Sequence, residues 1–295
     1  MSDLDNDEKQ LSGLAMFPMT SVSAVRTLFA GVFAAVCGFA AGPASAQDCG
    51  NGSGGFPAWL ERYKSRAGKL GVSPATVSRG LAGLSYDANV IRLDRSQRSF
   101  KLSFEQFYRR RVSNSLLNKG RRLLRTHSGT LSRVEGRYGV PGEVIIAIWG
   151  LETAYGRDGT GGKDIIRSLA TLAYDCRRSA FFTNELTYAL KILQRGDLSR
   201  SHMRGGWAGE IGQVQFLPSS YFKYAVDFDG DGRRDLTRSV PDMLASTANF
   251  LRAHGWKRGQ SYGPGTANYA VIREWNRAEV YQRTISRAAE LIGGR

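Results

Sequence analysis

The feature that most constrains this sequence is an apolar run that ends in a single carboxylate. From Val144 to Leu151 every residue except Gly150 is apolar, and Pro141 lies just before the run. Proline suits the first turn of a helix, where its missing N–H is not needed. A helix that is apolar on all sides has no face for water, so it is buried. The sequence therefore predicts a buried helix with Glu152 near its C-terminal end.

The position of Glu152 predicts a chemical role for it. Burial strips water from a carboxylate and raises its pKa, and the partial negative charge at a helix C-terminus acts in the same direction. A carboxyl group that is protonated near neutral pH can act as a general acid. The structural alternative is a buried glutamate that an arginine holds within the core, since ion-pair networks also perturb carboxylates.

Helical patterns dominate the rest of the chain, so the predicted fold class is mostly α with few short strands. Ser73 and Pro74 mark one helix start, as cap and first residue. Residues 86–93 are expected to form an irregular or strand-like connection. The basic runs 109–111 and 121–125 are interpreted as solvated helix faces. Further helices are expected at 56–67, 103–117, 131–138, 180–193 and 242–254.

The first 46 residues are interpreted as a secretion signal with an upstream extension. Arg26 precedes an apolar run at 28–41, which is followed by the small-x-small pattern of 44–46. Cleavage there would leave Gln47 as the first residue. The run is short for a membrane span of roughly 20 residues. We therefore expect export to the periplasm rather than a membrane anchor.

The cysteines fit an exported chain. Cys37 lies within the signal, and Val36 before it makes it a poor site for lipid attachment. Processing leaves Cys49 and Cys176, and two thiols in an oxidising compartment predict one disulfide. This bridge would tie the N-terminal segment to the middle of the chain. The alternative is a pair of free buried thiols.

The chain is strongly basic, with a formal net charge of +15. Such an excess favours anionic partners. An exported protein meets little nucleic acid, the arginines are scattered, and no nucleic-acid motif occurs. The expected partner is therefore peptidoglycan, whose peptides carry free carboxylates. We expect a monomer, with other cell-wall enzymes as candidate partners.

Four motifs follow one another along the chain. They are Trp149-Gly-Leu-Glu-Thr-x-Tyr-Gly156, Trp207-Ala-Gly-Glu-Ile-Gly-Gln-Val-Gln-Phe-Leu-Pro-Ser-Ser-Tyr221, Ala225-Val-Asp-Phe-Asp-Gly-Asp-Gly232 and Ala248-Asn-Phe-Leu-Arg-Ala-His-Gly-Trp256. Together they resemble the B-type lytic murein transglycosylases, in the same order and over about the whole processed chain. The resemblance implies an α+β lysozyme-like catalytic core at 131–259. A helical region at 47–130 would precede this core, and a C-terminal segment at 260–295 would close the cleft.

The resemblance also implies a reaction. Members of this family cleave the β-1,4 bond between N-acetylmuramic acid and N-acetylglucosamine and leave a 1,6-anhydro ring. By this likeness Glu152 is both acid and base, and no cofactor is needed for catalysis. One rival is a muramidase-type hydrolase with a second carboxylate. Glu210 is the best candidate for that group, ahead of Asp158 and Asp164. The other rival is a non-catalytic wall-binding protein.

Substrate contacts follow from the same likeness. Gln215 would hydrogen-bond substrate near the acid, and the pair Asn276 and Tyr281 would line the cleft. Arg177 and Arg178 would reach the glycan or its peptide, because the guanidinium fork suits carboxylates. The candidate sugar-stacking rings, each with core packing as an equal alternative, are Tyr155, Trp207, Phe216 and Trp275.

The chain departs from the family pattern at three positions. Gly206 and Phe250 stand where family members often carry Ser and Tyr, which removes two hydroxyl groups near the cleft. Phe250 stays in the predicted substrate-binding set. Trp275 replaces a frequent Tyr. These changes affect the positioning of substrate, while Glu152 is retained.

An aspartate-rich loop predicts a calcium site. Asp227, Asp229 and Asp231 alternate, and a glycine takes the sixth position, as in the first half of an EF-hand loop. Arg233 would offer its carbonyl at the seventh position. The twelfth residue is Arg238 instead of glutamate. The resemblance implies a longer loop in which Asp242 gives the last carboxylate. A Ca2+ ion there would have a structural role, because the loop is distant in sequence from Glu152, while the alternative is a solvated turn.

Overall fold

The computed structural model describes residues 49–96, 102–157 and 161–294, and in these ranges the chain is mostly α-helical, as predicted. The two short strands, β1 (Lys163–Asp164) and β2 (Arg204–Gly205), pair antiparallel. The signal at 1–46 and the candidate Asp158 lie outside the described residues. In the part of the chain that is described, no helix has the length and apolar character needed to cross a membrane.

The helices are α2 (Phe56–Ala67), α3 (Pro74–Gly80), α4 (Ala88–Ser96), α5 (Phe104–Arg111), α6 (Asn114–Thr126), α7 (Ser128–Tyr138), α8 (Gly142–Thr153), α9 (Ile165–Tyr174), α10 (Ser179–Arg195), α11 (Pro218–Tyr224), α12 (Val240–Ala253), α13 (Ala267–Trp275) and α14 (Glu279–Gly293). Short 3-10 turns lie at η2 (Gly68–Leu70) and η3 (Arg200–His202).

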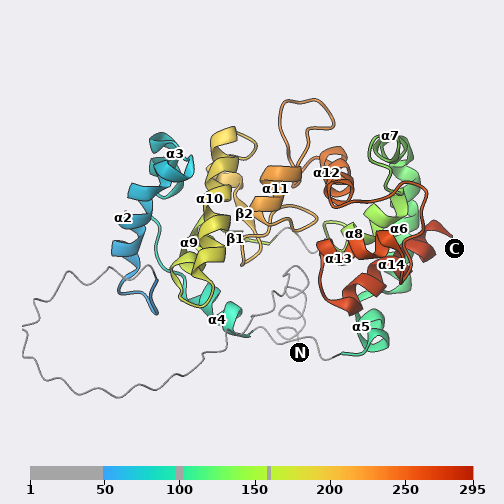
Figure 1. The fold of residues 1–295 in the computed structure, drawn as a ribbon, viewed down its shortest axis with the longest axis horizontal. Coiled ribbons are helices and arrows are strands. Elements are labelled where there is room, and N and C mark those ends of the chain that lie inside the picture. The colour runs from blue at the N-terminus through green and yellow to red at the C-terminus, as the bar shows by residue number, and fades with distance from the viewer. Residues whose placement is uncertain (1–48, 97–101, 158–160, 295) are drawn as a thin grey trace, which may run out of the picture.

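The helices form two groups along the long axis of the molecule (Figure 1). In the first group α2 and α4 pack on α9, and α3 and α11 pack on α10. In the second group α8 is surrounded by α6, α7, α12 and the C-terminal α14, and α5 also packs on α14. Helices from the beginning and the end of the chain therefore enclose α8 together. The division into regions at 47–130, 131–259 and 260–295 stays a prediction.

Helix α8 forms the buried centre of the second group. Every residue from Val144 to Thr153 is buried, and within α8 only Glu143 is not. Pro141 serves as the N-cap, so the helix begins one residue later than expected. Burying each large aliphatic side chain contributes about 1.5–3 kcal/mol. The predicted buried helix is confirmed, and its packing fixes the position of everything near its C-terminal end.

Two local predictions were wrong, both because a capping side chain was overlooked. Residues 86–93 contain the start of helix α4, where the Asp87 carboxylate accepts the backbone N–H groups of Asn89 and Val90. The segment 103–117 is broken at Val112, and Ser113 caps the new helix α6. A polar cap that satisfies free N–H groups outweighs a continuous apolar period.

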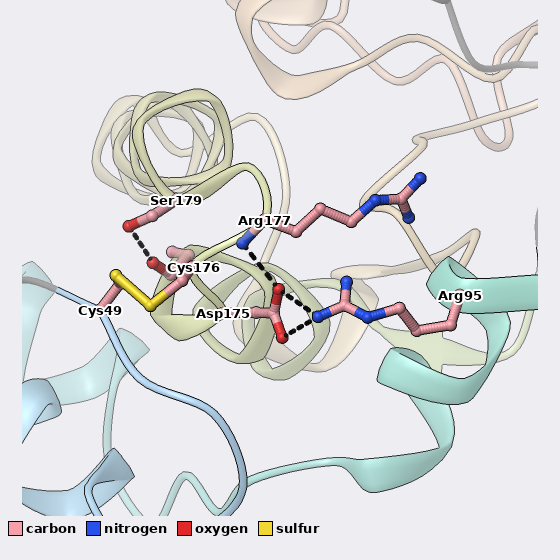
Figure 2. The surroundings of a disulfide bond; sticks show 7 residues. Cys49, Arg95, Asp175, Cys176, Arg177 and Ser179 are labelled. Carbon is pink, nitrogen blue, oxygen red and sulfur yellow. Dashed lines mark hydrogen bonds and ion pairs between the residues drawn. A yellow bond between two sulfur atoms is a disulfide. The ribbon is translucent and has the colours of Figure 1, made fainter.

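The predicted disulfide between Cys49 and Cys176 is present. It joins the segment before α2 to the turn between α9 and α10, next to a backbone hydrogen bond from Gly50 to Tyr174. Figure 2 shows the neighbouring Asp175, whose two carboxylate oxygens accept hydrogen bonds of 2.9 and 2.8 Å from Arg95. The bridge spans 127 residues. Closing a loop of that size stabilises the fold by about 4–5 kcal/mol in the chain-entropy account.

Candidate active site

The Glu152 carboxylate lies in the interior, beside the C-terminal helices. Only 8% of the residue is exposed. Its Oε1 accepts a hydrogen bond of 2.9 Å from Trp275 Nε1 and one of 2.8 Å from the Tyr281 hydroxyl. Its Oε2 is buried and has no hydrogen-bond partner among the described residues. One oxygen is therefore held in place, while the other remains available for a proton or a ligand.

These surroundings raise the pKa of Glu152 to about 7. Burial is the largest cause, because it disfavours the charged form. The hydrogen bonds from Trp275 and Tyr281 and the positive charge of Arg111 lower the pKa, whereas the carboxylate of Glu210 raises it. A carboxyl group with a pKa near neutrality can donate a proton and later accept one, which suits acid–base catalysis.

The end of α8 is held in an unusual backbone conformation. Ala154 and Tyr155 have φ angles of 48° and 63°, in the left-handed region that disfavours side chains. Gly150 permits this turn, because a Cβ there would lie 2.7 Å from the Tyr155 ring. The Thr153 hydroxyl donates to the Gln213 carbonyl at 2.7 Å. Such strain, about 1–3 kcal/mol per residue, is concentrated at functional sites in many proteins.

The junction between α13 and α14 supplies both hydrogen-bond donors to Glu152. Trp275 is the last residue of α13, and Tyr281 lies in the first turn of α14. Asn276 shapes the turn between them, because its Oδ1 accepts the Ala278 N–H at 2.9 Å. The structure thus places the Tyr281 hydroxyl directly on the candidate acid and Asn276 in the turn next to Trp275. Their predicted contacts with substrate stay predictions.

A second buried carboxyl group, Glu210, lies close enough to influence Glu152. Burial raises the pKa of Glu210 to about 7, and its Oε2 accepts the Ala208 N–H at 3.0 Å. Gly206 gives it space, since a Cβ there would lie 2.1 Å from that oxygen. The glycine at 206 is therefore matched to the glutamate at 210. The sequence identified Glu210 as the best second acid but could not show this pairing.

The loop before α11 carries the predicted Gln215 and a glutamine that the sequence analysis missed. Gln215 has a φ of 54°, and its side chain donates to the Gly212 carbonyl at 2.8 Å. Gln213 accepts from Trp149 Nε1 at 3.1 Å and donates to the Thr237 carbonyl at 3.1 Å. Gln213 therefore ties α8 to the aspartate-rich loop. Its only sequence signal is its place inside the second motif.

The aromatic candidates separate into two kinds. Phe216, Phe250 and Trp275 form one cluster, with ring centroids 5.2–5.7 Å apart, that leads to Glu152 through the indole of Trp275. Trp207 and Tyr155 are buried, as Phe216 and Phe250 also are, but neither ring belongs to this cluster, and the Tyr155 hydroxyl donates to a backbone carbonyl of α6. For these two rings the structure favours the core alternative.

The two arginines after the disulfide are held by a buried aspartate. Asp94 is 1% exposed and accepts from Arg177 at 2.8 Å and from Arg178. The guanidinium of Arg178 also stacks on Phe182, at 4.8 Å from the ring centroid. Asp94 was not predicted, because its partners lie more than 80 positions away. Whether the arginines reach substrate stays a prediction.

The aspartate-rich loop brings together three carboxylates, those of Asp227, Asp229 and Asp242. One oxygen of each lies within 4.8 Å of the others. Asp242 also accepts the backbone N–H groups of Phe228 and residue 235, at 2.7 and 2.9 Å. Carboxylate oxygens are hard donors of the kind that Ca2+ prefers, and backbone carbonyls and waters complete its usual set of roughly six to eight oxygens. The residues present therefore fit a calcium ion.

The other two predicted ligands lie outside this group of three. The Asp231 carboxylate accepts the Arg233 backbone N–H at 2.8 Å. The neighbouring Asp235 accepts a hydrogen bond from the Arg238 side chain at 2.6 Å. The assignments of Asp231 and of the Arg233 carbonyl therefore stay predictions.

Comparison with known proteins places this geometry in context. The family described as "Transglycosylase SLT domain" matches residues 55–266. Membrane-bound lytic murein transglycosylase B of Escherichia coli (strain K12) is 41% identical over 134 residues, which are 45% of this chain and 37% of that relative. The matched region thus spans well under half of the length of that curated relative.

Solved structures share the fold. SltB3 from Pseudomonas aeruginosa, in complex with NAG-NAM-pentapeptide, has a TM-score of 0.76 and 32% identity, over 81% of this chain and 80% of that one. The Escherichia coli lytic transglycosylase Slt35, in complex with calcium, has a TM-score of 0.69 and 23% identity, over 79% of this chain and 92% of that one. The second likeness concerns the fold alone.

Proposed function

The chain belongs to the transglycosylase SLT domain family, and on that basis we propose that it is a lytic murein transglycosylase acting on peptidoglycan. The observation that carries the proposal is the state of Glu152. A buried carboxyl group with a pKa of about 7, one oxygen fixed and the other unpartnered, is suited to repeated proton transfer. The non-catalytic alternative gives no reason for a buried carboxyl group that forms no ion pair with any described residue.

In the proposed reaction one proton leaves Glu152 and returns to it. Protonated Glu152 donates to the oxygen that links N-acetylmuramic acid to N-acetylglucosamine, and the bond from C1 to that oxygen breaks. Trp275 and Tyr281 stabilise the resulting carboxylate through their hydrogen bonds to Oε1. The carboxylate then takes the proton of the C6 hydroxyl as that oxygen attacks C1. The product is a 1,6-anhydro ring, and no water is consumed.

Hydrolysis with a second carboxylate is the alternative function. The presence of a second buried carboxyl group, that of Glu210, near Glu152 favours it. A muramidase needs a carboxylate on the far side of the sugar to act as nucleophile or to activate water. Burial raises the pKa of Glu210 as well, to about 7. Glu210 is only 3% exposed, and its Oε2 is held by the Ala208 N–H at 3.0 Å, so it has little access to water or to a sugar. We therefore prefer the reaction with a single carboxylate.

Mass spectrometry of muropeptides released from purified sacculi tests the proposal. We expect glycan ends that are lighter by one water than hydrolysis products. Glu152→Gln should abolish release while sacculus binding and folding persist, and Glu105→Gln, an exposed glutamate on α5, serves as the matched control. Reducing ends in place of anhydro ends would establish the hydrolase. Unchanged release by Glu152→Gln would remove Glu152 from catalysis.

The substrate contacts are proposed on the same basis. SltB3 was solved with NAG-NAM-pentapeptide, and peptidoglycan peptides carry carboxylates. Arg177 and Arg178 keep 42% and 27% of their side chains exposed while Asp94 holds them. They suit a peptide carboxylate. We assign Gln215 and Asn276 to the glycan.

We further propose that the aspartate-rich loop holds a structural Ca2+. Asp227, Asp229 and Asp242 would be ligands, and Asp231 and the Arg233 carbonyl would complete the set. Three carboxylates at such short distances repel one another unless a cation neutralises their charge. Slt35 was solved with calcium, which accords with this assignment. The ion would supply no catalytic chemistry, and would hold the loop between α11 and α12.

The periplasm is the proposed location. The sequence of the first 46 residues and the disulfide between Cys49 and Cys176 both favour export to an oxidising compartment. The similar Escherichia coli protein is described as membrane-bound. N-terminal sequencing of the protein from a periplasmic extract should begin at Gln47. A lipid-modified N-terminus would overturn the proposed processing.

A further inference from the structure

We propose that Arg111, the last residue of α5, is a positioning residue for Glu152: it holds the end of α8 and the hydroxyl that contacts the carboxylate, and so stabilises the state left after proton donation. The role in turnover rests on the proposed function, whereas the physical effect on Glu152 does not. The basic run 109–111 predicts a solvated helix face, but in the structure the Arg111 guanidinium contacts the C-terminal end of α8.

The geometry links Arg111 to Glu152 by two short routes. Its guanidinium donates a hydrogen bond of 2.7 Å to the carbonyl of Leu151, the residue before the acid. Its guanidinium also acts on the Tyr281 hydroxyl, whose pKa it lowers, and this hydroxyl in turn donates to Glu152 Oε1 at 2.8 Å. An arginine has several donors in a rigid fork, so one side chain can serve both acceptors. A flexible lysine could not hold both with the same geometry.

Electrostatics explains why a cation belongs at this place. The last carbonyls of a helix carry partial negative charge, which opposes ionisation of a nearby carboxylate. Arg111 occupies the Leu151 carbonyl, and Lys119 of α6 donates to the Ala154 carbonyl at 3.3 Å. These two contacts reduce the extent to which the helix end raises the pKa of Glu152.

The charged and titratable groups around Glu152 act in opposite directions. Against the dominant effect of burial, Arg111 lowers its pKa and Glu210 raises it. Tyr281 from α14 lowers it through its hydrogen bond, and His127, before α7, packs on Trp149 of α8 at 6.1 Å between ring centroids. Arg111 therefore supplies the positive charge that favours the carboxylate form.

The direct test measures the protonation of Glu152 without any turnover. Trp275 Nε1 donates to Glu152, so its indole N–H resonance should titrate with the carboxyl group, and Trp275→Phe assigns that resonance. In Arg111→Gln the positive charge that favours the carboxylate is lost, so we expect the titration midpoint to rise by about one pH unit. One unit corresponds to about 1.4 kcal/mol of lost stabilisation of the carboxylate. Arg111→Lys keeps the charge without the fork and should give a smaller rise.

Arg109→Gln is the matched control, because it removes the same charge from the exposed face of the same helix. Its midpoint should equal that of the wild type. An unchanged midpoint in Arg111→Gln, or equal shifts in Arg111→Gln and Arg109→Gln, would overturn the proposal. If Arg111→Gln does not fold, the comparison of Arg111→Lys with the wild type decides in the same way.

Turnover of purified sacculi separates this inference from the proposed function. Arg111→Gln should lower kcat about tenfold with little change in KM, and the alkaline limb of the pH profile should move upward with the indole midpoint. A merely structural arginine would change thermal stability without moving that limb. If the wild-type protein releases no muropeptides, the proposed function fails, while the indole titration still decides the role of Arg111.

Discussion

Two clusters of carboxylates in this molecule lie in opposite kinds of surroundings. At the end of α8, Glu152 is buried among apolar side chains and meets two neutral donors, the indole of Trp275 and the hydroxyl of Tyr281. In the aspartate-rich loop, Asp227 and Asp229 are partly or fully exposed, lie next to Asp242, and accept several backbone N–H groups. The chemical group is the same, but its surroundings differ in water, charge and number of donors.

The difference shows how surroundings select a function for a carboxylate. Glu152 is buried and forms no ion pair with a described residue, so it favours its neutral form, its pKa rises to about 7 and it can exchange a proton. The carboxylates of the loop lie within 4.8 Å of one another, so their negative charges repel and they favour a divalent cation. One cluster therefore suits proton transfer and the other suits structural metal binding.

The largest expected effect concerns stability at Glu152. Its pKa rises from the model-peptide value of 4.5 to about 7 on folding, so the folded state prefers the protonated form. The stability this group contributes is complete below about pH 4.5 and is lost as pH rises through 7, by on the order of 3 kcal/mol. Glu152→Gln should therefore be more stable than the wild type above pH 7, and nearly equal to it at pH 4.

Thermal unfolding across this pH range checks the prediction. The difference in free energy of unfolding between Glu152→Gln and the wild type should grow between pH 4 and pH 8. Glu105→Gln, which changes an exposed glutamate, should follow the wild type at every pH. A constant difference across the range would mean that Glu152 is not desolvated in the folded protein, and the contrast with the loop would disappear.

The loop should respond to calcium where Glu152 does not. At a free Ca2+ concentration 100 times Kd, binding stabilises the folded state by about 2.7 kcal/mol. Chelation should lower Tm by several degrees, and Asp229→Asn should abolish the response. Calorimetric titration gives the affinity. Equal Tm values with calcium and with chelator would favour the solvated-turn alternative.

Much of the fold was predictable because its strongest signals are local. The apolar run before Glu152 predicts a buried helix, and Ser73 with Pro74 predicts the start of α3, whose cap accepts the Thr76 N–H at 3.3 Å. The break at Val112 was missed, since Ser113 competes with an uninterrupted apolar period. Local patterns do not reveal which of two comparable signals the rest of the fold will favour.

The site was predictable only in part, because its partners come from distant segments. Glu152 follows from its own helix, but Arg111 lies 40 positions before its acceptor Leu151, and Tyr281 lies 129 positions after Glu152. A basic run on an amphipathic helix has the same sequence pattern whether its side chains face water or the end of another helix. Long-range partners such as Arg111 and Asp94 become recognisable only when the chain has folded.

A smaller effect is expected at Tyr281, which tests how far neutral donors offset burial. Tyr281→Phe removes the 2.8 Å hydrogen bond to Oε1, so the pKa of Glu152 should rise. The alkaline limb of activity on sacculi should move upward, and kcat should fall about tenfold, because a hydrogen bond to a charged group contributes about 1.5–3 kcal/mol. The Trp275 indole titration measures the pKa independently of activity.

Tyr269→Phe serves as the control for Tyr281→Phe, since it removes a hydroxyl from a ring on the neighbouring helix α13 that is not one of the hydrogen-bond donors to Glu152. Tyr269→Phe should leave the alkaline limb of the pH–activity profile unchanged. A limb that moved equally in both variants would indicate a general loosening of the C-terminal helices. Loss of activity without any movement of the limb would assign Tyr281 to substrate, as the sequence predicted.

The smallest expected effect is at Glu210, where substitution should lower the pKa of Glu152 and not raise it. The carboxylate of Glu210 raises the pKa of Glu152, so Glu210→Gln should lower the Trp275 indole midpoint by a fraction of a pH unit. The shift is small because Glu210, with a pKa of about 7, carries only part of a charge where Glu152 titrates. Glutamine keeps an oxygen for the Ala208 N–H, so folding should persist. If Glu210→Gln instead abolished turnover as Glu152→Gln does, Glu210 would be the second catalytic carboxylate, and hydrolysis would replace ring closure as the proposed reaction.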